Sequence, residues 1–256
     1  MDISDKVAII TGGASGLGWA TSELLHGIGA KIAIFDMNDD LGQQRAEALG
    51  EGASYCSVNV ADDESVANGI AAVKEAFGTV HIVCNYAGIG TPSRTVGKDG
   101  PMPLDWFKHV IDVNLIGTFN VTRLAAAVMQ ENEPVTGDGC RGCIINTASV
   151  AAYEGQIGQA AYSASKGGVV GMTLPIARDL ASMGVRVNTI APGLINTPML
   201  QGLPDPAKES LANTVLFPRR LGEPQEIACV AQMLIENDYM NGETIRMDGG
   251  IRMQPK

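Results

Sequence analysis

The first 36 residues place a glycine-rich turn between two apolar runs, and this order constrains the fold more than any other feature of the chain. Residues 6–10 are a short apolar run that is typical of a buried parallel strand. They lead directly into Thr11–Gly18, after which apolar residues recur at helical spacing to residue 28. A second apolar run, 31–35, ends in Asp36. The pattern predicts a strand, a tight turn, a helix and a second strand.

This turn has the composition of a dinucleotide site. Its glycines let the backbone turn tightly and approach a pyrophosphate, which binds at the N-terminus of the following helix. Asp36 lies twenty residues after Gly16, where a carboxylate accepts a hydrogen bond from a ribose 2′-hydroxyl and repels a 2′-phosphate. The pattern predicts NAD as the cofactor; the alternative is a glycine-rich turn in an unrelated sheet protein. The predicted cofactor residues of this unit are Gly12, Ser15, Gly16, Leu17, Gly18 and Asp36.

Strand-like and helix-like segments alternate along the rest of the chain. Strands are expected at 54–58, 81–84, 143–146, 185–190 and 243–247, and helices at 39–49, 62–77, 104–130 and 162–182. This alternation predicts an α/β fold with a single Rossmann-type, doubly wound domain over residues 1–256. We expect a seven-stranded, mostly parallel sheet with helices on both faces. No linker-like segment or repeat divides the chain.

The polar and glycine motifs fall where expected strands end. Ligands of such sheets bind beyond the carboxyl ends of the strands, so these motifs predict one shared site. They are Gly12, Asp36, Asn59, Asn85–Gly88, Ser149 and Pro192–Gly193.

Tyr162 and Lys166 are four residues apart on an expected helix, so they share one face, about 5–6 Å apart at Cβ. An ammonium beside a phenol favours the phenolate and lowers a phenol pKa that is ordinarily about 10. Tyr162 is thus a candidate general acid/base for a carbinol–ketone interconversion, with Ser149 donating to the same substrate oxygen. Alternatively, the pair is a solvated helix face and Ser149 is a turn residue.

Together the motifs resemble those of the short-chain dehydrogenase/reductase family over essentially the whole chain. The matching segments are Thr11–Gly18, Asn85–Gly88, Asp112–Asn114, Ser149, Tyr162–Lys166, and Pro192–Gly193 with Thr197. The resemblance implies a tetrad in which Tyr162 transfers the proton and Ser149 orients the substrate oxygen. Lys166 would hold the ribose and lower the tyrosine pKa, and Asn114 would anchor a proton-relaying water. Asn114 could instead cap or bend its helix.

The resemblance also implies cofactor contacts further along the chain. The backbone from Gly193 to Ile195 and the Thr197 hydroxyl would hold the nicotinamide carboxamide, although Thr197 could also cap the helix that begins at Pro198. Ala87 and Gly88 would border the adenosine ribose. The implied contacts are Asn59, Val60, Asn85, Ala87, Gly88, Tyr162, Lys166, Pro192, Gly193, Ile195 and Thr197.

Two positions depart from the family pattern. The usual Asn-Asn-Ala-Gly reads Asn85-Tyr86-Ala87-Gly88, which leaves the role of the second asparagine open. Asn59 stands where an aspartate commonly meets the adenine amino group. Its amide oxygen can accept the same hydrogen bond, but without charge.

Within the family, residues 145–162, 172–180, 220–224 and 251–255 resemble the branch that oxidises 3-hydroxyacyl-CoA thioesters with NAD. The resemblance implies a short or 2-methyl-branched acyl chain, with Ser149, Gln156 and Tyr162 at the substrate. Gln156 could instead be a surface loop residue. The alternatives are a steroid or an aryl or alkyl alcohol dehydrogenase, an NADPH-linked 3-oxoacyl-carrier-protein reductase, which Asp36 disfavours, and a non-catalytic nucleotide-binding protein, which an intact tetrad disfavours.

Two variable segments should determine the substrate. Residues 90–103 are longer and more polar than a tight strand–helix connection requires, and they resemble the insertion of that branch. Residues 194–217 are apolar enough to form a lid over an acyl chain, or else a helical pair packed on the sheet edge. The apolar residues of this second segment are Met199, Leu200, Leu203, Leu211, Val215, Leu216 and Phe217.

Charge and composition limit the partners. A net charge of −10 without a basic cluster argues against nucleic acid or an anionic membrane. The acidic N-terminus resembles neither a signal peptide nor an anchor, so we expect a soluble cytoplasmic protein with reduced thiols. Cys140 and Cys143 have metal-ligand spacing, but no second pair or nearby histidine accompanies them, and no metal is predicted.

Two helices carry more apolar residues than one core-facing stripe requires, around Phe119 and around Leu174. A surplus apolar face implies a partner, and the resemblance implies that these helices pair across two-fold axes in a homotetramer. The alternative is that both faces are covered within the monomer.

Overall fold

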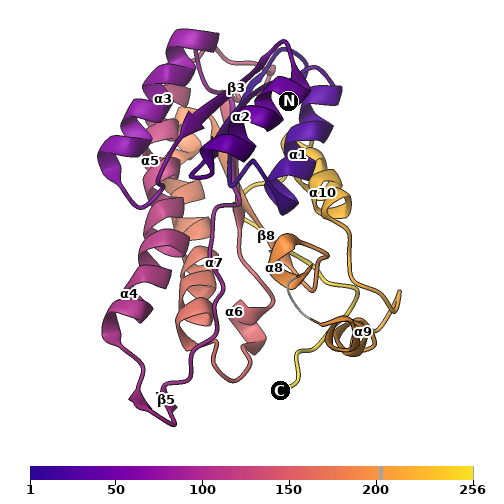
Figure 1. The fold of residues 1–256 in the computed structure, drawn as a ribbon. Coiled ribbons are helices and arrows are strands. Elements are labelled where there is room, and N and C mark those ends of the chain that lie inside the picture. The colour runs from indigo at the N-terminus through magenta and orange to yellow at the C-terminus, as the bar shows by residue number, and fades with distance from the viewer. Residues whose placement is uncertain (202–203, 256) are drawn as a thin grey trace.

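The computed structural model describes residues 1–201 and 204–255 and contains a seven-stranded sheet (Figure 1). Its strands are β1 (Val7–Thr11), β2 (Lys31–Asp36), β3 (Ala53–Ser57), β4 (Ile82–Asn85), β7 (Gly142–Thr147), β8 (Val185–Pro192) and β9 (Thr244–Met247). The order across the sheet is β3-β2-β1-β4-β7-β8-β9, and every neighbouring pair is parallel. The predicted doubly wound α/β fold with seven strands is therefore confirmed.

The chain reverses its direction across the sheet between β1 and β4. From β1 it moves outward to β2 and β3, and it then returns to β4 on the other side of β1. Thr11, the last residue of β1, is in register with Phe35 on one side and with Asn85 on the other. In doubly wound sheets, ligands bind at the carboxyl ends of the strands where the order reverses.

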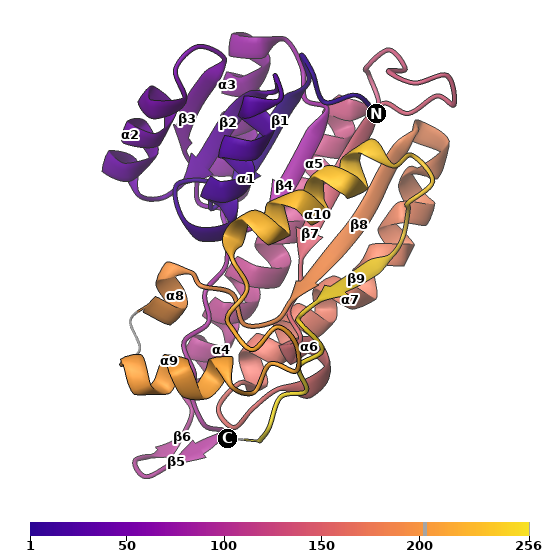
Figure 2. The same cartoon turned by 90° about the vertical axis from the view of Figure 1, so that its right-hand side faces the viewer.

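Helices cover both faces of this sheet (Figure 2). One face is covered by α1 (Gly16–Gly27), α2 (Asp39–Leu49) and α10 (Pro224–Glu236). The other face is covered by α3 (Asp63–Phe77), α5 (Gly117–Met129) and α7 (Ala160–Leu180). Ala8 and Ile10 pack on the first face and Val7 and Ile9 on the second, because successive side chains of a strand point in opposite directions.

The helix predicted over 104–130 is divided in the structure. A π-helical segment, η1 (Asp112–Ile116), joins α4 (Leu104–Ile111) to α5. Asn114 lies inside this segment, and its backbone carbonyl accepts a hydrogen bond from the Thr118 hydroxyl at 2.8 Å. The prediction of one uninterrupted helix is wrong here, and the interpretation of Asn114 as a residue of a distorted helix is supported. Such π segments often lie at functional sites.

Several short elements lie beyond the carboxyl ends of the strands, in the lower part of Figure 2. They are the hairpin β5 (Val96–Gly97) and β6 (Gly100–Pro101), α6 (Ala151–Glu154), α8 (Pro198–Gln201) and α9 (Asp205–Ala212). α7 continues into a short 3₁₀ turn, η2 (Ala181–Met183). Among the described residues, no helix combines the length and the apolar character needed to cross a membrane.

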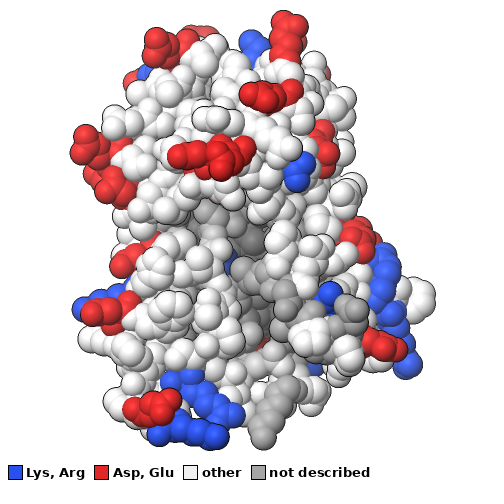
Figure 3. All heavy atoms as spheres, in the orientation of Figure 1, with Lys and Arg blue, Asp and Glu red and all other residues white. Residues whose placement is uncertain are grey.

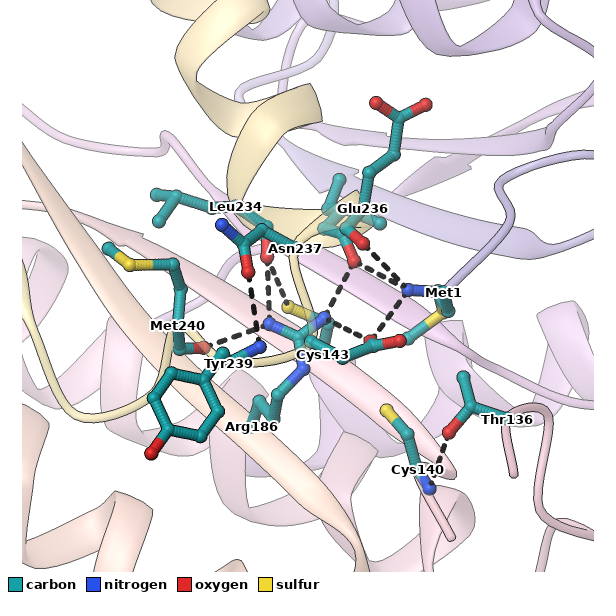
Figure 4. A network of polar contacts seen from close by, with 12 residues as sticks. Met1, Thr136, Cys140, Cys143, Arg186, Leu234, Glu236, Asn237, Tyr239 and Met240 are labelled. Carbon is teal, nitrogen blue, oxygen red and sulfur yellow. Dashed lines mark hydrogen bonds and ion pairs between the residues drawn. The ribbon is translucent and has the colours of Figure 1, made fainter. Parts of the chain in front are cut away.

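A buried cation ties the end of α10 to the sheet (Figure 4). Arg186 of β8 donates to the carbonyl oxygens of Leu234 and Ile235 at 2.7 and 2.6 Å. Asp238 accepts from Arg186 at 3.3 Å and from the Met1 ammonium at 2.7 Å. The guanidinium therefore satisfies the last carbonyls of the helix, which lack partners within it.

The two cysteines with metal-ligand spacing lie beside this network (Figure 4). Cys140 and Cys143 are both buried, and Cys143 belongs to β7. Burial raises the pKa of the Cys143 thiol to about 11, against a smaller opposing effect of Arg186. A buried thiol with a raised pKa is inert, so Cys143 is a core residue of the central sheet.

Candidate active site

The glycine loop between β1 and α1 is shaped by close backbone contacts. Gly12 and Gly16 have φ angles of +63° and +51°, in the left-handed region that favours glycine. A Cβ on Gly12 would lie 3.0 Å from the backbone nitrogen of Ala87, and a Cβ on Gly18 would lie 2.2 Å from the carbonyl oxygen of Gly12. The loop thus keeps this conformation only while these positions carry no side chain.

Asp36 lies beside this loop at the end of β2. One carboxylate oxygen accepts from the backbone nitrogen of Ala14 and the other from that of Asn38, both at 3.1 Å. Each carboxylate oxygen has a second lone pair, so Asp36 can hold the loop and still accept a bond from a ribose hydroxyl.

Arg45 is a residue of this region that the sequence motifs missed. Its Nε donates to the carbonyl oxygen of Ala14 at 3.3 Å, and its guanidinium lies 4.2 Å from the ring centroid of Trp19. It therefore contacts, from α2, the same loop residue that Asp36 holds. No motif marks it, because its partners are a backbone carbonyl and an indole face.

Asn59 and Val60, which were predicted to contact the adenine end of the cofactor, follow β3. Asn59 donates its backbone N–H to the Ser65 hydroxyl at 3.0 Å, and its side-chain oxygen accepts from the backbone nitrogen of Ala61 at 3.1 Å. That oxygen retains one lone pair for an adenine amino group. Val60 is buried against Gly117 of α5, where a Cβ would lie 2.6 Å from a Val60 methyl.

The Asn85 side chain is held by contacts within the fold, at the end of β4. It is buried at the end of β4 and donates to the Asn146 side-chain oxygen at 2.9 Å and to the Thr122 hydroxyl at 3.2 Å. Tyr86 occupies the second asparagine position, and its hydroxyl accepts from Thr21 of α1 at 2.9 Å. Its side chain therefore packs against the loop helix.

Ala87 contacts the end of β1, and Gly88 passes close to two predicted catalytic side chains. The backbone nitrogen of Ala87 donates to the Thr11 hydroxyl at 3.0 Å. A Cβ on Gly88 would lie 3.1 Å from the side-chain oxygen of Asn114 and 3.6 Å from the ammonium of Lys166. Only glycine leaves this gap open beside the lysine.

Asn114 fixes the segment that follows β4. Its side-chain oxygen accepts from the backbone nitrogen of Ile89 at 2.8 Å, and its amide nitrogen donates to the Ile89 carbonyl at 2.9 Å and to the Ser165 hydroxyl at 3.1 Å. Asn114 thus ties the π segment to α7 one residue before Lys166.

Tyr162, Ser149 and Lys166 converge at the carboxyl end of β7. The hydroxyls of Tyr162 and Ser149 are hydrogen-bonded to each other. The Lys166 ammonium lies 5.8 Å from the centroid of the Tyr162 ring and donates to the Thr147 carbonyl at 2.7 Å. Ser149 also forms a turn, since its side-chain oxygen accepts from the backbone nitrogen of Ala151 at 3.1 Å. The structure therefore brings the predicted acid/base, hydroxyl donor and cation together.

The pKa of Tyr162 differs from the prediction. Burial raises it above the ordinary value of 10, and the hydrogen bond with Ser149 opposes that shift. Burial also lowers the pKa of Lys166 to about 8. The expected lowering of the tyrosine pKa by the ammonium is contradicted, because both groups are desolvated and the ammonium is directed at the Thr147 carbonyl.

The segment after β8 forms the wall of the site that faces the glycine loop. A Cβ on Gly193 would lie 2.7 Å from the Cα of Asp248, so Gly193 allows this strand end to pass the chain after β9. Gly222 pairs with the residues on either side of Ile195: its nitrogen donates to the Leu194 carbonyl and its carbonyl accepts from the Asn196 nitrogen. The backbone groups of Ile195 thus remain outside this pairing, as carboxamide binding requires.

Two neighbours of Ile195 complete this wall. The Thr197 carbonyl accepts from the backbone nitrogens of Leu200 and Gln201 at 2.9 Å, which confirms its position at the start of a helix. Its side-chain carbons lie 3.6 Å from where a Cβ on Gly16 would be, so this segment faces the glycine loop. Pro192 is buried at the end of β8.

The predicted substrate residue Gln156 contacts the C-terminal tail. Its side-chain nitrogen donates to the carbonyl oxygen of Gln254 at 2.9 Å. It lines a cavity of about 430 Å³ together with Pro92, Ser93, Arg94, Ile157, Gly158 and Pro255. The Gln156 side chain is therefore held by the C-terminal tail. Among the described residues, no contact joins it to Tyr162.

The 194–217 segment contains two short helices, α8 and α9, among its described residues. Leu216 and Phe217 are 72% and 81% exposed, whereas Val215 is buried. Leu203, a predicted lid residue, lies outside the described residues. Figure 3 shows the molecular surface hollowed near its middle on this side, with acidic residues above the hollow and residues of both charges below it and to the right.

The chain is similar to known dehydrogenases over almost its entire length. A family model described as enoyl-(acyl carrier protein) reductase matches residues 12–252. The 3-hydroxyacyl-CoA dehydrogenase type-2 of Bos taurus is 55% identical over 255 residues, which cover 99% of this chain and 97% of that protein. The 3-oxoacyl-[acyl-carrier-protein] reductase of Thermotoga maritima is 36% identical over 98% of this chain and 99% of that protein.

A solved structure agrees with these sequences. The crystal structure of 3-hydroxyacyl-CoA dehydrogenase type-2 from Mycobacterium avium matches with a TM-score of 0.94 and 43% identity, and the match covers 98% of each chain. The chain belongs to the short-chain dehydrogenase/reductase family. It is an oxidoreductase, and its site is that of an enzyme with a nicotinamide cofactor.

Proposed function

We propose that this protein is an NAD-dependent dehydrogenase of short or 2-methyl-branched 3-hydroxyacyl-CoA thioesters. The observation that carries the proposal is the convergence of Ser149, Tyr162 and Lys166 at the carboxyl end of β7. A hydroxyl pair beside a buried ammonium is the arrangement that removes a proton from a secondary alcohol.

NAD is the proposed form of the cofactor. Gly12, Gly16 and Gly18 would take the pyrophosphate, and Asp36 would accept from the adenosine ribose and repel a 2′-phosphate. Ile195 and Thr197 would hold the carboxamide. The bound nicotinamide supplies the hydride acceptor for the reaction.

The protein's own residues would manage the proton. Ser149 would donate to the substrate oxygen and hold it beside Tyr162, which would take the hydroxyl proton as the carbonyl forms. Tyr162 would accept this proton in its phenolate form and become a neutral phenol, and Lys166 would hold the ribose. Asn114 would keep η1 and the start of α7 in place through its bonds to Ile89 and Ser165.

The substrate class rests on the relatives and on segment 90–103. Two relatives at 55% and 54% identity are 3-hydroxyacyl-CoA dehydrogenases type-2. In this chain the segment carries exposed Arg94 and Lys98 around the β5–β6 hairpin, and Arg94 lines the cavity beside Gln156. This polar mouth would leave the CoA moiety outside the site, while the 194–217 segment would cover the acyl part.

A biosynthetic reductase is the second candidate, because the Thermotoga maritima relative carries that name. Asp36 disfavours it, since such a reductase would need a cation for the 2′-phosphate of NADPH.

A panel of 3-hydroxybutyryl-CoA, its 2-methyl homologue, a steroid and a small aryl carbinol, each assayed with NAD, tests the proposal. We expect the two thioesters to have the highest kcat/KM. No turnover of either thioester beside brisk turnover of the steroid or carbinol would refute the substrate class.

We also propose that the chain assembles as a homotetramer. Ile116, the last residue of η1, and Phe119 of α5 are each 48% exposed, and Leu174 of α7 is 44% exposed, so these helices present apolar surface. Phe119→Glu should dissociate the assembly in analytical ultracentrifugation. Phe217→Ser, which removes an exposed aromatic from another region, should leave it intact. A wild-type monomer at micromolar concentration would exclude the tetramer.

Two further expectations belong to the same proposal. The whole chain, 1–256, would act as one domain whose substrate segments are 90–103 and 194–217. The five cysteines are free, which is compatible with the cytoplasmic location expected from the sequence. Limited proteolysis and fractionation of the source cells would test the two expectations.

A further inference from the structure

The short helix after Ser149 is clamped by an arginine from the far end of the chain. Glu154 is the last residue of α6, and its two carboxylate oxygens accept from the two terminal nitrogens of Arg246 at 3.1 and 3.0 Å. Both side chains are less than a quarter exposed. A bidentate pair of this kind is stronger and more geometrically specific than a single surface contact. Arg246 also lowers the pKa of the Glu154 carboxyl, so the pair is ionised at neutral pH.

The same carboxylate holds the C-terminal tail, residues 252–255. The backbone nitrogen of Met253 donates to Glu154 at 3.0 Å. Two more bonds join the tail to the chain just after α6: Ile157 N–H to the Pro255 carbonyl at 3.0 Å, and the Gln156 side chain to the Gln254 carbonyl at 2.9 Å. The tail thus lies along residues 154–157 as an added, extended segment.

The tail also places an apolar side chain at the substrate end. Met253 packs against a small cluster formed by Val150, Val215, Ile251 and Leu194. Val150 follows Ser149 directly, and Leu194 follows Gly193 in the proposed nicotinamide wall. The cluster therefore joins the residue next to the reacting hydroxyl, the 194–217 segment and the tail.

We propose that Glu154 and Arg246 are positioning residues, and that they seat the tail so that Met253 forms the wall limiting the acyl chain. The inference rests on the proposed dehydrogenase site. It assigns to the tail a part in substrate selection, while cofactor binding at the glycine loop remains independent of it. Neither residue touches the reacting atoms, so both act through the position of Ser149 and of the wall.

The Glu154→Gln variant tests the clamp, because the amide retains the shape but loses the charge. We expect the KM of the preferred alcohol to rise about tenfold, the equivalent of about 1.4 kcal/mol, with little change in the dissociation constant of NADH. Glu131→Gln is the matched control, since Glu131 forms a single exposed contact with Lys74 at 3.5 Å, remote from the site. It should leave both constants unchanged.

Met253→Ala tests the wall without disturbing the ion pair. It should raise kcat/KM for longer acyl chains relative to butyryl, because it removes the side chain that limits length. Unchanged chain-length preference together with unchanged KM in Glu154→Gln would overturn the proposal. A parallel loss of alcohol and NADH affinity in Glu154→Gln would also overturn it, since that result indicates general unfolding.

These tests stand apart from the substrate assignment. Wild-type turnover of a carbinol in place of the thioester would refute the proposed substrate class. The same variants would then be measured with that carbinol. A higher KM for that carbinol with an unchanged NADH dissociation constant would still show that the Glu154–Arg246 pair positions the substrate-binding residues.

Discussion

The two ends of the site are built in different ways. The cofactor end consists of a glycine loop and three adjoining strand ends, and its shape follows from backbone contacts such as that of Gly18 with the Gly12 carbonyl. The proposed substrate end lies below the sheet in Figure 2 and consists of the hairpin, α6, α8, α9 and the C-terminal tail. Side-chain contacts between distant segments hold that end, with Glu154 and Arg246 at its centre.

The difference indicates how such a protein divides its functions. A binding surface shaped by backbone contacts tolerates few substitutions. The nucleotide end therefore suits one cofactor that many family members share. Loops and tails joined by side chains can be exchanged without altering the sheet, so the choice of alcohol can change there. Predictions for the two ends should therefore separate cofactor binding from substrate binding.

The largest effect is expected at the junction of the two ends. Tyr162→Phe should lower kcat by about 10²–10⁴-fold, because it removes the group that transfers the proton. NADH should still bind, since the dinucleotide contacts remain. Steady-state rates and fluorescence titration with NADH would measure the two quantities, and turnover above about a tenth of wild type would place the acid/base role on another residue.

The second prediction concerns Gly18→Ala, which should disturb the glycine loop and leave the substrate end unchanged. Gly18→Ala places a Cβ 2.2 Å from the Gly12 carbonyl oxygen, so the loop must move, at a cost of about 1–3 kcal/mol in stability. We expect weaker NADH binding and a lower urea midpoint. Gly27→Ala in the same helix is the control: apart from its chain neighbours and the nearby helix backbone, no atom lies within 4 Å of its Cβ position, and the variant should be neutral or stabilising by up to about 1 kcal/mol. Equal behaviour of both variants would disprove the steric account.

Cofactor choice is the third test. Wild-type kcat/KM should favour NAD over NADP by at least about tenfold, because the 2′-phosphate would lie against the Asp36 carboxylate. Asp36→Asn should reduce this preference while keeping an oxygen acceptor for the loop. Comparable wild-type rates with the two cofactors would refute the role of the charge.

The smallest predicted effect is a shift of the pH profile. Alcohol oxidation should accelerate from neutral to alkaline pH, because burial raises the pKa of Tyr162 and the phenolate is the proton acceptor. The hydrogen bond with Ser149 lowers that pKa, so Ser149→Ala should move the rise to higher pH. A flat profile, with chemistry limiting the rate, would count against the tyrosine as the base.

Much of the cofactor end could be predicted from the sequence because its signals are local. The glycine spacing, the acidic end of β2 and the helix over 39–49 follow from short motifs and apolar periodicity, and the structure bears out these elements. Asp62, where the helix over 62–77 was expected to begin, is the N-cap of α3 and accepts from the Ser65 nitrogen at 2.7 Å.

Other features depend on contacts that no short motif encodes. The π segment at 112–116 adds a residue to one helical turn, which apolar periodicity does not reveal. Arg45 and Glu154 find their partners only in three dimensions. The raised pKa of Tyr162 arises from burial, whereas its spacing from Lys166 led to the opposite expectation.

The separation of the two ends can be tested most directly by shortening the 96–101 hairpin to a glycine linker. NADH affinity would be measured by titration, and KM would be measured for 3-hydroxybutyryl-CoA and for a small carbinol. We predict unchanged NADH affinity, a much higher KM for the thioester and a nearly unchanged KM for the carbinol. Equal increases of KM for both alcohols, or a matching loss of NADH affinity, would contradict the account.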